Sequence, residues 1–377
     1  MARITTTLSD LAKSLQEARK QTGKGIVAQL REIRDLRRRA RGFGLTDYYD
    51  YRLFDDAAYS GHDKGEIAGW RTEEWLANTL NGNWHALVRD KIDFYTLLDA
   101  HRLPYPRVHA IYQRAGQRFP GVPTFRTLDD LVQHLRSGMP YPFFAKPSCG
   151  DRGYGAFAIT AYDAVHDQLV EDGGRSLSFT ELSTRLHERK IGVEPDSGYI
   201  FAERLVQHPV LEAICGPGIA SIRLVLLVGD EGPLPFRALW KIVAANNVID
   251  HYRRGTIGNL LAAVDVDSGK VIRAITGYGL SRRLVEQHPD SGVGLPGFEL
   301  PQWSEIVTLC REAALIFPQI RIQHWDVALC DRGPVLLEMN SEGAIDFLQF
   351  AHDQGLLDST LKAFVEKYGL TQKTQDG

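Results

Sequence analysis

The chain has 377 residues, of which 44% are hydrophobic and 10% aromatic, enough for a large core divided into two or three subdomains. Its formal net charge of −3 gives no general reason to bind nucleic acid, so any anion site has to be local. Four scattered cysteines without a C-x-x-C pair argue against a zinc knuckle or a disulfide framework. Because the first residues also lack the apolar core of a signal peptide, we expect a cytoplasmic protein.

Residues 1–45 are predicted to form a basic helical arm. Apolar residues recur at helical spacing from about residue 9 to residue 40, with Lys and Arg filling the gaps, which predicts one or two amphipathic helices. Arg37, Arg38, Arg39 and Arg41 end this segment. The charges form either a solvated helix face or a contact with an anionic membrane surface or an acidic partner protein.

Residues 46–137 are predicted to form a small aromatic-rich cap and the start of a nucleotide-handling region. A helical pattern follows Asp90 and Lys91, and residues 127–136 form a second helical pattern with Thr127 as N-cap.

Beyond residue 137, short apolar runs predict strands, and helical stretches lie among them. The strands are expected at 143–146, 156–160, 199–202, 223–228, 236–243 and 335–338, and the helices near 163–170, 179–189 and 303–315. This mixture indicates an α+β or α/β architecture. No G-x-x-x-x-G-K-[ST] sequence is present, which excludes a P-loop.

A glycine-rich loop follows one predicted strand. Lys146 ends the strand, and the loop contains Gly150, Gly153 and Gly155. Such a loop brings backbone N–H groups close to a phosphate, although the same pattern is also that of a simple hairpin turn.

Three oxygen-bearing side chains flank a predicted hairpin at residues 331–334. Glu338 and Asn340 are two residues apart and therefore project from the same strand face, while Asp326 reaches them from the paired strand. Hard oxygen ligands of this kind suit magnesium bound to a nucleotide phosphate. The alternative is a carboxylate pair that Arg and backbone donors satisfy.

A third segment, residues 203–206, continues a hydrophobic strand. An extended backbone here offers N–H and C=O groups to an adenine edge, and the same pattern also fits an ordinary core strand.

In this order, the elements resemble the ATP-grasp superfamily. More narrowly, the chain from about residue 45 to residue 350 looks like the sugar-transfer-associated ATP-grasp family, which is predicted to act in cell-surface polysaccharide synthesis. The runs that carry the resemblance are Tyr48-Tyr49, Ser221-Ile222-Arg223, His288-Pro289-Asp290, Leu300-Pro301-Gln302-Trp303, Trp325-Asp326-Val327-Ala328 and 333–340.

The resemblance implies an α+β fold in which two subdomains grip ATP. The arm (1–45) and the cap (46–137) would precede a lid (138–205) and a C-terminal subdomain (206–377) that carries the metal site.

The resemblance also implies roles for individual residues. Lys91 and Lys146 would contact the α and β phosphates, and the loop from Ser148 through Gly150 and Gly153 to Gly155 would close over them. Adenine would be held by Glu203, Arg204, Leu205 and Val206, and the ribose by Glu212. Asp326, Glu338 and Asn340 would hold Mg2+, or Mn2+ in its place.

Arg223, Lys241 and Asn259 are the expected catalytic residues on the acceptor side, where Arg223 and Lys241 would face the transferring phosphoryl group or the acyl phosphate. The family pattern has an arginine near Lys241 and paired glycines near residues 255–259. Cys149 is interpreted as a small spacer and not as a nucleophile. The roles of His288 and His324 stay open: His288 either contacts a substrate or caps a loop, and His324 either shares the face of Asp326 or is a hydrogen-bonded structural histidine.

The predicted activity is that of a carboxylate–amine ligase, which uses ATP to form an acyl phosphate that an amine then attacks. The alternatives are a phosphotransferase on the same fold and a non-enzymatic nucleotide-binding subunit that regulates a partner. Carboxylate and amine substrates and no nucleic acid are expected. The oligomeric state is open, with a homodimer as one alternative.

Overall fold

The computed structural model describes residues 8–150, 153–188, 192–194, 197–245, 247 and 249–370. The chain forms two compact units, each assembled from segments that are distant in sequence. The first contains Met1–Trp84, Val210–Trp325 and Ser341–Gly377, and the second contains His85–Pro209 and Asp326–Asn340.

The first unit begins with two helices, α1 (Leu8–Thr22) and α2 (Ile26–Arg39), which confirms the predicted amphipathic segment. Helix α2 buries Gln29, Ile33 and Leu36 on one face, as the helical spacing requires. Short helices follow at α3 (Asp47–Asp50), η1 (Lys64–Glu66), α4 (Thr72–Leu80) and η2 (Gly82–His85).

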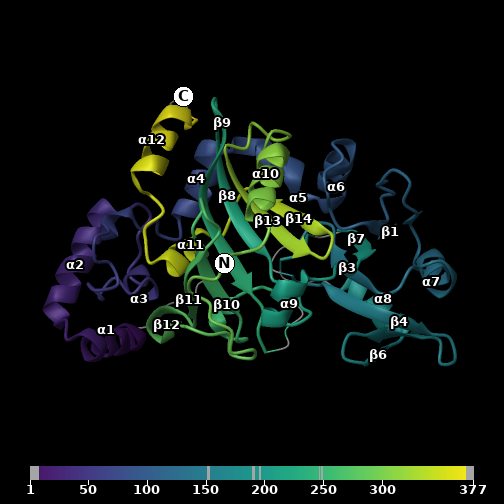
Figure 1. Ribbon diagram of the computed structural model, residues 1–377, viewed down its shortest axis with the longest axis horizontal. Coiled ribbons are helices and arrows are strands. Elements are labelled where there is room, and N and C mark those ends of the chain that lie inside the picture. Colours follow the sequence, from purple (N-terminus) through teal and green to yellow (C-terminus); the bar gives the residue numbers. More distant parts are fainter. Residues whose placement is uncertain are drawn as a thin grey trace. The chain divides into compact units, whose positions relative to one another are not determined.

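The first unit contains a sheet in the order β12-β11-β10-β9-β8-β13 (Figure 1). Its strands are β8 (Ile222–Gly229), β9 (Gly232–Ile242), β10 (Leu260–Val264), β11 (Val271–Thr276), β12 (Arg283–Leu284) and the start of β13 (Ile322–Cys330). The elements outside the sheet are α9 (Pro209–Cys215), η3 (Arg253–Gly255), η4 (Gly279–Ser281), α10 (Trp303–Ala314), α11 (Ile345–His352) and α12 (Ser359–Tyr368).

The position of strand β10 in the core of this sheet accounts for its apolar sequence. Strand β10 reads LLAAV and is buried throughout, because helix α11 packs against it and strands on both sides pair with it. Tyr48, Tyr51, Phe54 and Phe350 extend the same core toward the N-terminal helices. The aromatic cluster of the predicted cap is therefore part of the core of the first unit.

The second unit contains a sheet in the order β2-β1-β7-β3-β4-β5-β6. Its strands are β1 (Val108–Tyr112), β2 (Thr124–Phe125), β3 (Phe143–Pro147), β4 (Phe157–Asp163), β5 (Gln168–Glu171), β6 (Ser176–Leu177) and β7 (Tyr199–Glu203). The helices are α5 (Ala86–Arg89), α6 (Lys91–Ala100), α7 (Leu128–Ser137) and α8 (Phe179–His187). Only the β1–β2 pair among the described strand pairs of this sheet is parallel.

The segment 163–170 corrects one prediction, because it contains a β-turn region and not a helix. Residue Asp163 ends β4, and its carboxylate accepts hydrogen bonds from the backbone N–H groups of Val165 and His166 at 2.9 and 3.3 Å. These bonds fix a turn, and Asp167 then adopts a positive φ of 52° before β5 begins. By contrast, Thr127 caps α7 as predicted, since its hydroxyl accepts from Asp130 N.

Strand β13 passes from the first unit into the second, where β14 (Gly333–Asn340) lies beside it. The hairpin turns at residues 331–334, as predicted, with Gly333 at a φ of 104° that favours glycine. In the first unit, the buried Asn81 donates to the carbonyls of Ile322 and Ser341 and accepts from Ile322 N. Asn81 thus fixes the chain where β13 begins and where it leaves β14.

We predict that Asn81→Ala lowers the free energy of unfolding by roughly 2–4 kcal/mol, because it leaves buried backbone groups without partners. Urea unfolding monitored by circular dichroism measures the change. Asn78→Ala, which removes an exposed amide from the same helix, is the matched control. A similar stability for both variants would show that the Asn81 bonds contribute little.

Candidate nucleotide and metal site

The start of helix α6 places Lys91 against the glycine-rich loop of the second unit. Asp90 caps the helix by accepting from Ile92 N at 2.7 Å, which sets the direction of the next residue. The backbone N–H of Lys91 donates to Ser148 O, and its Nζ donates to Gly150 O, both at 2.9 Å. Two predicted phosphate-binding elements, Lys91 and the loop, are therefore in contact.

Lys146 projects from β3 into a partly buried position. Its Nζ donates to Tyr95 Oη at 2.7 Å, and Tyr95 Oη donates to Leu337 O at 2.8 Å. Burial lowers the pKa of Lys146 to about 8, while the nearby Glu338 carboxylate opposes this shift. Tyr95, which positions Lys146, was not marked by any sequence pattern, because a tyrosine in an amphipathic helix is indistinguishable from a core residue.

The structure brings Asp326 of β13 together with Glu338 and Asn340 of β14. Asn340 Nδ2 lies 3.2 Å from Glu338 Oε1 and 3.5 Å from Asp326 Oδ2. Asp326 is 2% exposed, and Lys91 Nζ lies 3.6 Å from Glu338 Oε2. The period-2 argument for a shared face therefore agrees with the geometry.

These three side chains fit a divalent cation by their chemistry. Two carboxylates and one amide oxygen are the hard ligands that Mg2+ prefers. Rotating the Asn340 amide by half a turn would present its oxygen in place of its nitrogen, and the two are interchangeable in shape. Among the described residues, no group of three or more His, Cys, Asp or Glu side chains is placed to hold a metal. The candidate metal site is therefore the set of two carboxylates and one amide formed by Asp326, Glu338 and Asn340.

The glycine-rich loop has the backbone conformation that its glycines permit. Gly153 and Gly155 adopt φ values of 69° and 79°, and residues 151–152 lie outside the described part of the chain. Cys149 Sγ donates to Asp90 Oδ2 at 3.2 Å. Burial and this carboxylate raise the pKa of Cys149 to about 11, which keeps the thiol neutral and supports its interpretation as a spacer.

The predicted adenine segment follows β7. Glu203 accepts from Arg107 N at 2.7 Å and forms an ion pair with Arg332, while Arg204 pairs with Asp172 at 2.7 Å. These side chains are engaged within the second unit. A role in adenine binding would therefore fall to backbone groups of the segment and to the side chains of Leu205 and Val206; Val206 is 55% exposed.

The first unit holds the residues predicted for the acceptor side. Arg223 of β8 donates to Gly343 O at 3.0 Å, and Lys241 Nζ of β9 lies 3.1 Å from Asp250 Oδ2. Both basic residues are 8% exposed. Glu212 lies exposed on α9, where a ribose contact stays a prediction.

Asn259 holds the loop that precedes β10. Its Oδ1 accepts from Ala244 N and Asn247 Nδ2, and its Nδ2 donates to the carbonyls of Ile249 and His251. The side chain is fully buried, and its amide is engaged through both ends. Asn259 therefore holds this loop in place, and its predicted catalytic role stays a prediction.

The two histidines singled out in the sequence lie in buried positions of the first unit. His288 bonds to Val243 O at 2.8 Å through Nε2, and its Nδ1 accepts from Asp290 N and Ser291 N, so it holds a turn. His324 packs against Gly343, where an added Cβ would come within 2.0 Å of its ring. Gly343 is thus required to be glycine by the close approach of this ring.

A pair of half-buried acids in the first unit was missed by sequence reasoning. Glu73 of α4 accepts from Ala344 N, and its carboxyl group also feels the charge of Asp346 of α11. Burial, followed by the Asp346 charge, raises the pKa of Glu73 to about 7, and burial also raises the pKa of Asp346. Glu73 resembled an ordinary acid in the first turn of a helix, so no local signal distinguished it.

A family model matches residues 72–365, and the chain belongs to this family, the sugar-transfer associated ATP-grasp proteins. No curated protein matches the chain by sequence.

Solved structures with a similar fold include an L-amino acid ligase from Bacillus licheniformis, with 12% identity, a TM-score of 0.40, and coverage of 76% of this chain and 49% of that chain. A D-alanyl-alanine synthetase A from Vibrio cholerae has 10% identity and a TM-score of 0.43, covering 77% of this chain and 68% of that one. The chain thus spans about half the length of the B. licheniformis ligase.

None of the helices in the described residues is long and apolar enough to cross a membrane.

We predict that Glu73 makes stability fall as pH rises. Its pKa is about 7 in the folded chain against 4.5 for the free group, so the folded state binds more protons between these values. Stability from this group is complete below about pH 4.5 and is lost as pH rises through about 7, a change of about 3 kcal/mol.

Glu73→Gln removes this titration and keeps the acceptor for Ala344 N. We therefore expect the difference in unfolding free energy between the native chain and this variant to change by up to about 3 kcal/mol from about pH 5 to about pH 8. Urea unfolding at several pH values measures it, with the exposed Glu74→Gln as control. Parallel pH profiles for the native chain and Glu73→Gln would contradict the prediction.

Proposed function

We propose that this protein is an ATP-dependent carboxylate–amine ligase. The observation that carries the proposal is the convergence of Asp326, Glu338 and Asn340. Lys91 lies beside Glu338, and Lys146 is hydrogen-bonded through Tyr95 to the strand that carries Glu338. Membership of the ATP-grasp family supports the use of ATP at these residues. Mg2+ bound by the three side chains would neutralise charge on the nucleotide phosphates.

The arrangement supports phosphoryl transfer because it supplies charge and position without a protein nucleophile. Lys91 and Lys146 would hold the phosphates by charge-assisted hydrogen bonds. The neutral Cys149 thiol would not compete as a nucleophile in the glycine-rich loop. This loop would exclude water from an acyl phosphate, which water otherwise hydrolyses.

The proposed reaction has two steps. A substrate carboxylate oxygen attacks the γ-phosphorus of ATP, and the bond to the β–γ bridging oxygen breaks, releasing ADP. An amine then attacks the acyl carbon, the bond to the phosphate oxygen breaks, and an amide and phosphate result. Arg223 and Lys241 are proposed to contact the acyl phosphate through their guanidinium and ammonium groups.

We also propose a place in the synthesis of cell-surface polysaccharides; the family description, sugar-transfer associated, supports a link to sugar transfer. We propose that the carboxylate is borne by a sugar or by a precursor that is joined to one. An assay pool should therefore contain uronic acids as well as amino acids.

We predict that the chain with ATP and Mg2+ converts a member of this pool to a conjugate, with ADP and phosphate formed in equal amounts. Glu338→Gln should lower kcat/KM at least about 100-fold, since it removes a carboxylate that would hold Mg2+ against the transferring phosphoryl group. Mass spectrometry identifies the product, and coupled detection of ADP gives the rate. Glu366→Gln, an exposed substitution of the same type on α12, should leave the rate unchanged.

The product distinguishes the alternatives. A substrate heavier by one phosphoryl group, with no separate phosphate, would identify a phosphotransferase. Binding of ATP with no turnover across the pool would favour a regulatory nucleotide-binding protein. Equal turnover by Glu338→Gln and the native chain would overturn the assigned metal site.

A further inference from the structure

One exposed face of helix α2 carries a stripe of cations. Successive residues of an α-helix are rotated by about 100°, so positions 27, 30, 31, 34, 37 and 38 fall within an arc of about 120°. This arc lies opposite the buried face of Gln29, Ile33 and Leu36. The stripe, which we call the α2 surface, consists of Val27, Leu30, Arg31, Arg34, Arg37 and Arg38, all of them exposed.

Neighbouring acids do not neutralise the α2 surface. Asp35 pairs with Arg39 at 2.8 Å, and Glu32 pairs with Lys24 and Lys64 at 2.7 and 2.6 Å. Within the described part of the chain, the four arginines of the α2 surface form no ion pair or hydrogen bond through their side chains. The four arginines of the α2 surface are therefore a local concentration of positive charge on a chain whose net charge is −3.

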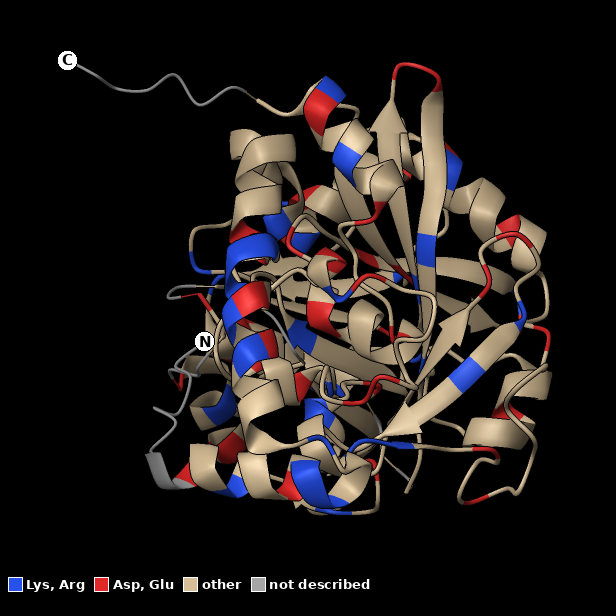
Figure 2. Cartoon of the chain, turned by 90° about the vertical axis from the view of Figure 1, so that its left-hand side faces the viewer, with Lys and Arg blue, Asp and Glu red and all other residues tan. Residues whose placement is uncertain are grey.

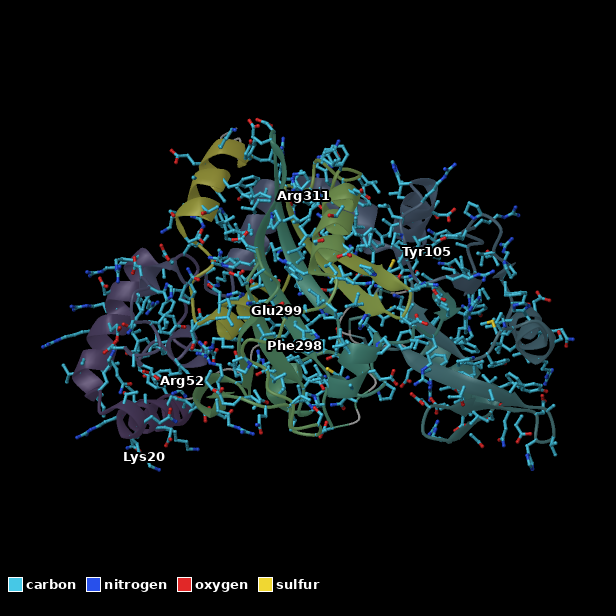
Figure 3. The ribbon with its side chains drawn as sticks, viewed as in Figure 1. Lys20, Arg52, Tyr105, Phe298, Glu299 and Arg311 are labelled. Carbon is cyan, nitrogen blue, oxygen red and sulfur yellow. The ribbon has the colours of Figure 1, made fainter. Side chains whose placement is uncertain are left out.

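Helix α1 adds little to this charge. Lys13, Arg19 and Lys20 are exposed there, and Lys20 points away from the helix in Figure 3, but Asp10 and Glu17 lie on the same helix. Figure 2 shows basic and acidic positions together along these N-terminal helices. Of the described parts of these two helices, α2 therefore carries the larger excess of exposed cations on one face.

We propose that the α2 surface docks on a membrane surface rich in anionic phospholipid. Guanidinium groups form paired hydrogen bonds with phosphate oxygens, and a polybasic segment is attracted to anionic headgroups. Val27 and Leu30, 62% and 46% exposed, lie in the same stripe and would enter the headgroup boundary as the helix lies along it.

The shape of the α2 surface favours a membrane over a folded acidic protein. It is one exposed face of a single helix, and its charged side chains lie along that face. A fluid layer of headgroups can adjust to such a face, with each arginine finding its own phosphate. The arm also precedes the residues that match the family, 72–365, so docking would use a segment outside that match. This inference does not depend on the proposed ligase activity.

Vesicle co-sedimentation of the full chain tests the proposal. We expect binding to vesicles of phosphatidylcholine mixed with phosphatidylglycerol and none to phosphatidylcholine alone. Binding should be lost as salt rises from about 0.1 M to about 1 M, where the Debye length falls from about 10 Å to about 3 Å. Replacing Arg31 and Arg34 by Gln should lower the partition coefficient about 25-fold, or about fivefold for each arginine.

The matched control replaces Arg118 and Arg311, two exposed arginines elsewhere in the chain, by Gln. This control changes the net charge by the same amount as the α2 variant and should bind anionic vesicles as the native chain does. Because Arg31 and Arg34 have no side-chain partner among the described residues, and Arg118 and Arg311 are exposed, far-ultraviolet circular dichroism and the Tm should be unchanged in both variants.

Three outcomes would overturn the proposal. One is equal loss of binding in the control, which would show a response to total charge. A second is equal binding to neutral and anionic vesicles. The third is retention on an acidic polypeptide column, dependent on Arg31 and Arg34, without vesicle binding, which would identify an acidic protein as the partner of the α2 surface.

Discussion

Two successive hydrogen bonds, from Lys146 to Tyr95 and from Tyr95 to the Leu337 carbonyl, hold the candidate site of the second unit together. They join β3, α6 and β14, which carry Lys146, Lys91 and Glu338 respectively. A buried ammonium group is costly unless it is hydrogen-bonded, so the tyrosine oxygen stabilises the lysine in this position. Since Leu337 immediately precedes Glu338, the same bonds also fix the strand that presents the carboxylate.

The loop after β14, which belongs to the first unit, is held in place by close packing. Gly343 accepts from Arg223 through its carbonyl and leaves no room for a side chain beside the His324 ring. The next residue, Ala344, has a positive φ of 46° and donates to Glu73. A strained backbone of this kind persists only where its surroundings hold it in place, and here a guanidinium, an imidazole ring and a carboxyl group do so.

The sequence predicted those features that depend on local spacing. Asp326, Glu338 and Asn340 could be grouped because strand residues alternate between faces and because Gly333 marks the turn. Tyr95 and Glu73 could not be found, since their importance comes from groups distant in the sequence, the Leu337 carbonyl and the Ala344 amide. The helix expected near 163–170 was wrong for the opposite reason: the Asp163 side chain bonds to its own neighbouring backbone, and this local interaction prevailed over the apolar pattern.

Two asparagines show how positioning and binding groups differ. Asn259 makes four hydrogen bonds of 2.9 to 3.1 Å to fixed neighbours, and such an amide is satisfied without any ligand. Asn340 is placed against two carboxylates at 3.2 and 3.5 Å, distances longer than a typical N–H···O bond. An amide N–H group offsets only part of the repulsion between two carboxylates, whereas a divalent cation would neutralise both of them. We therefore propose that Asn340, which lies half-buried beside two carboxylates and near Lys91, belongs to a metal–nucleotide site on the β13–β14 hairpin, whereas Asn259 is satisfied by its own neighbours.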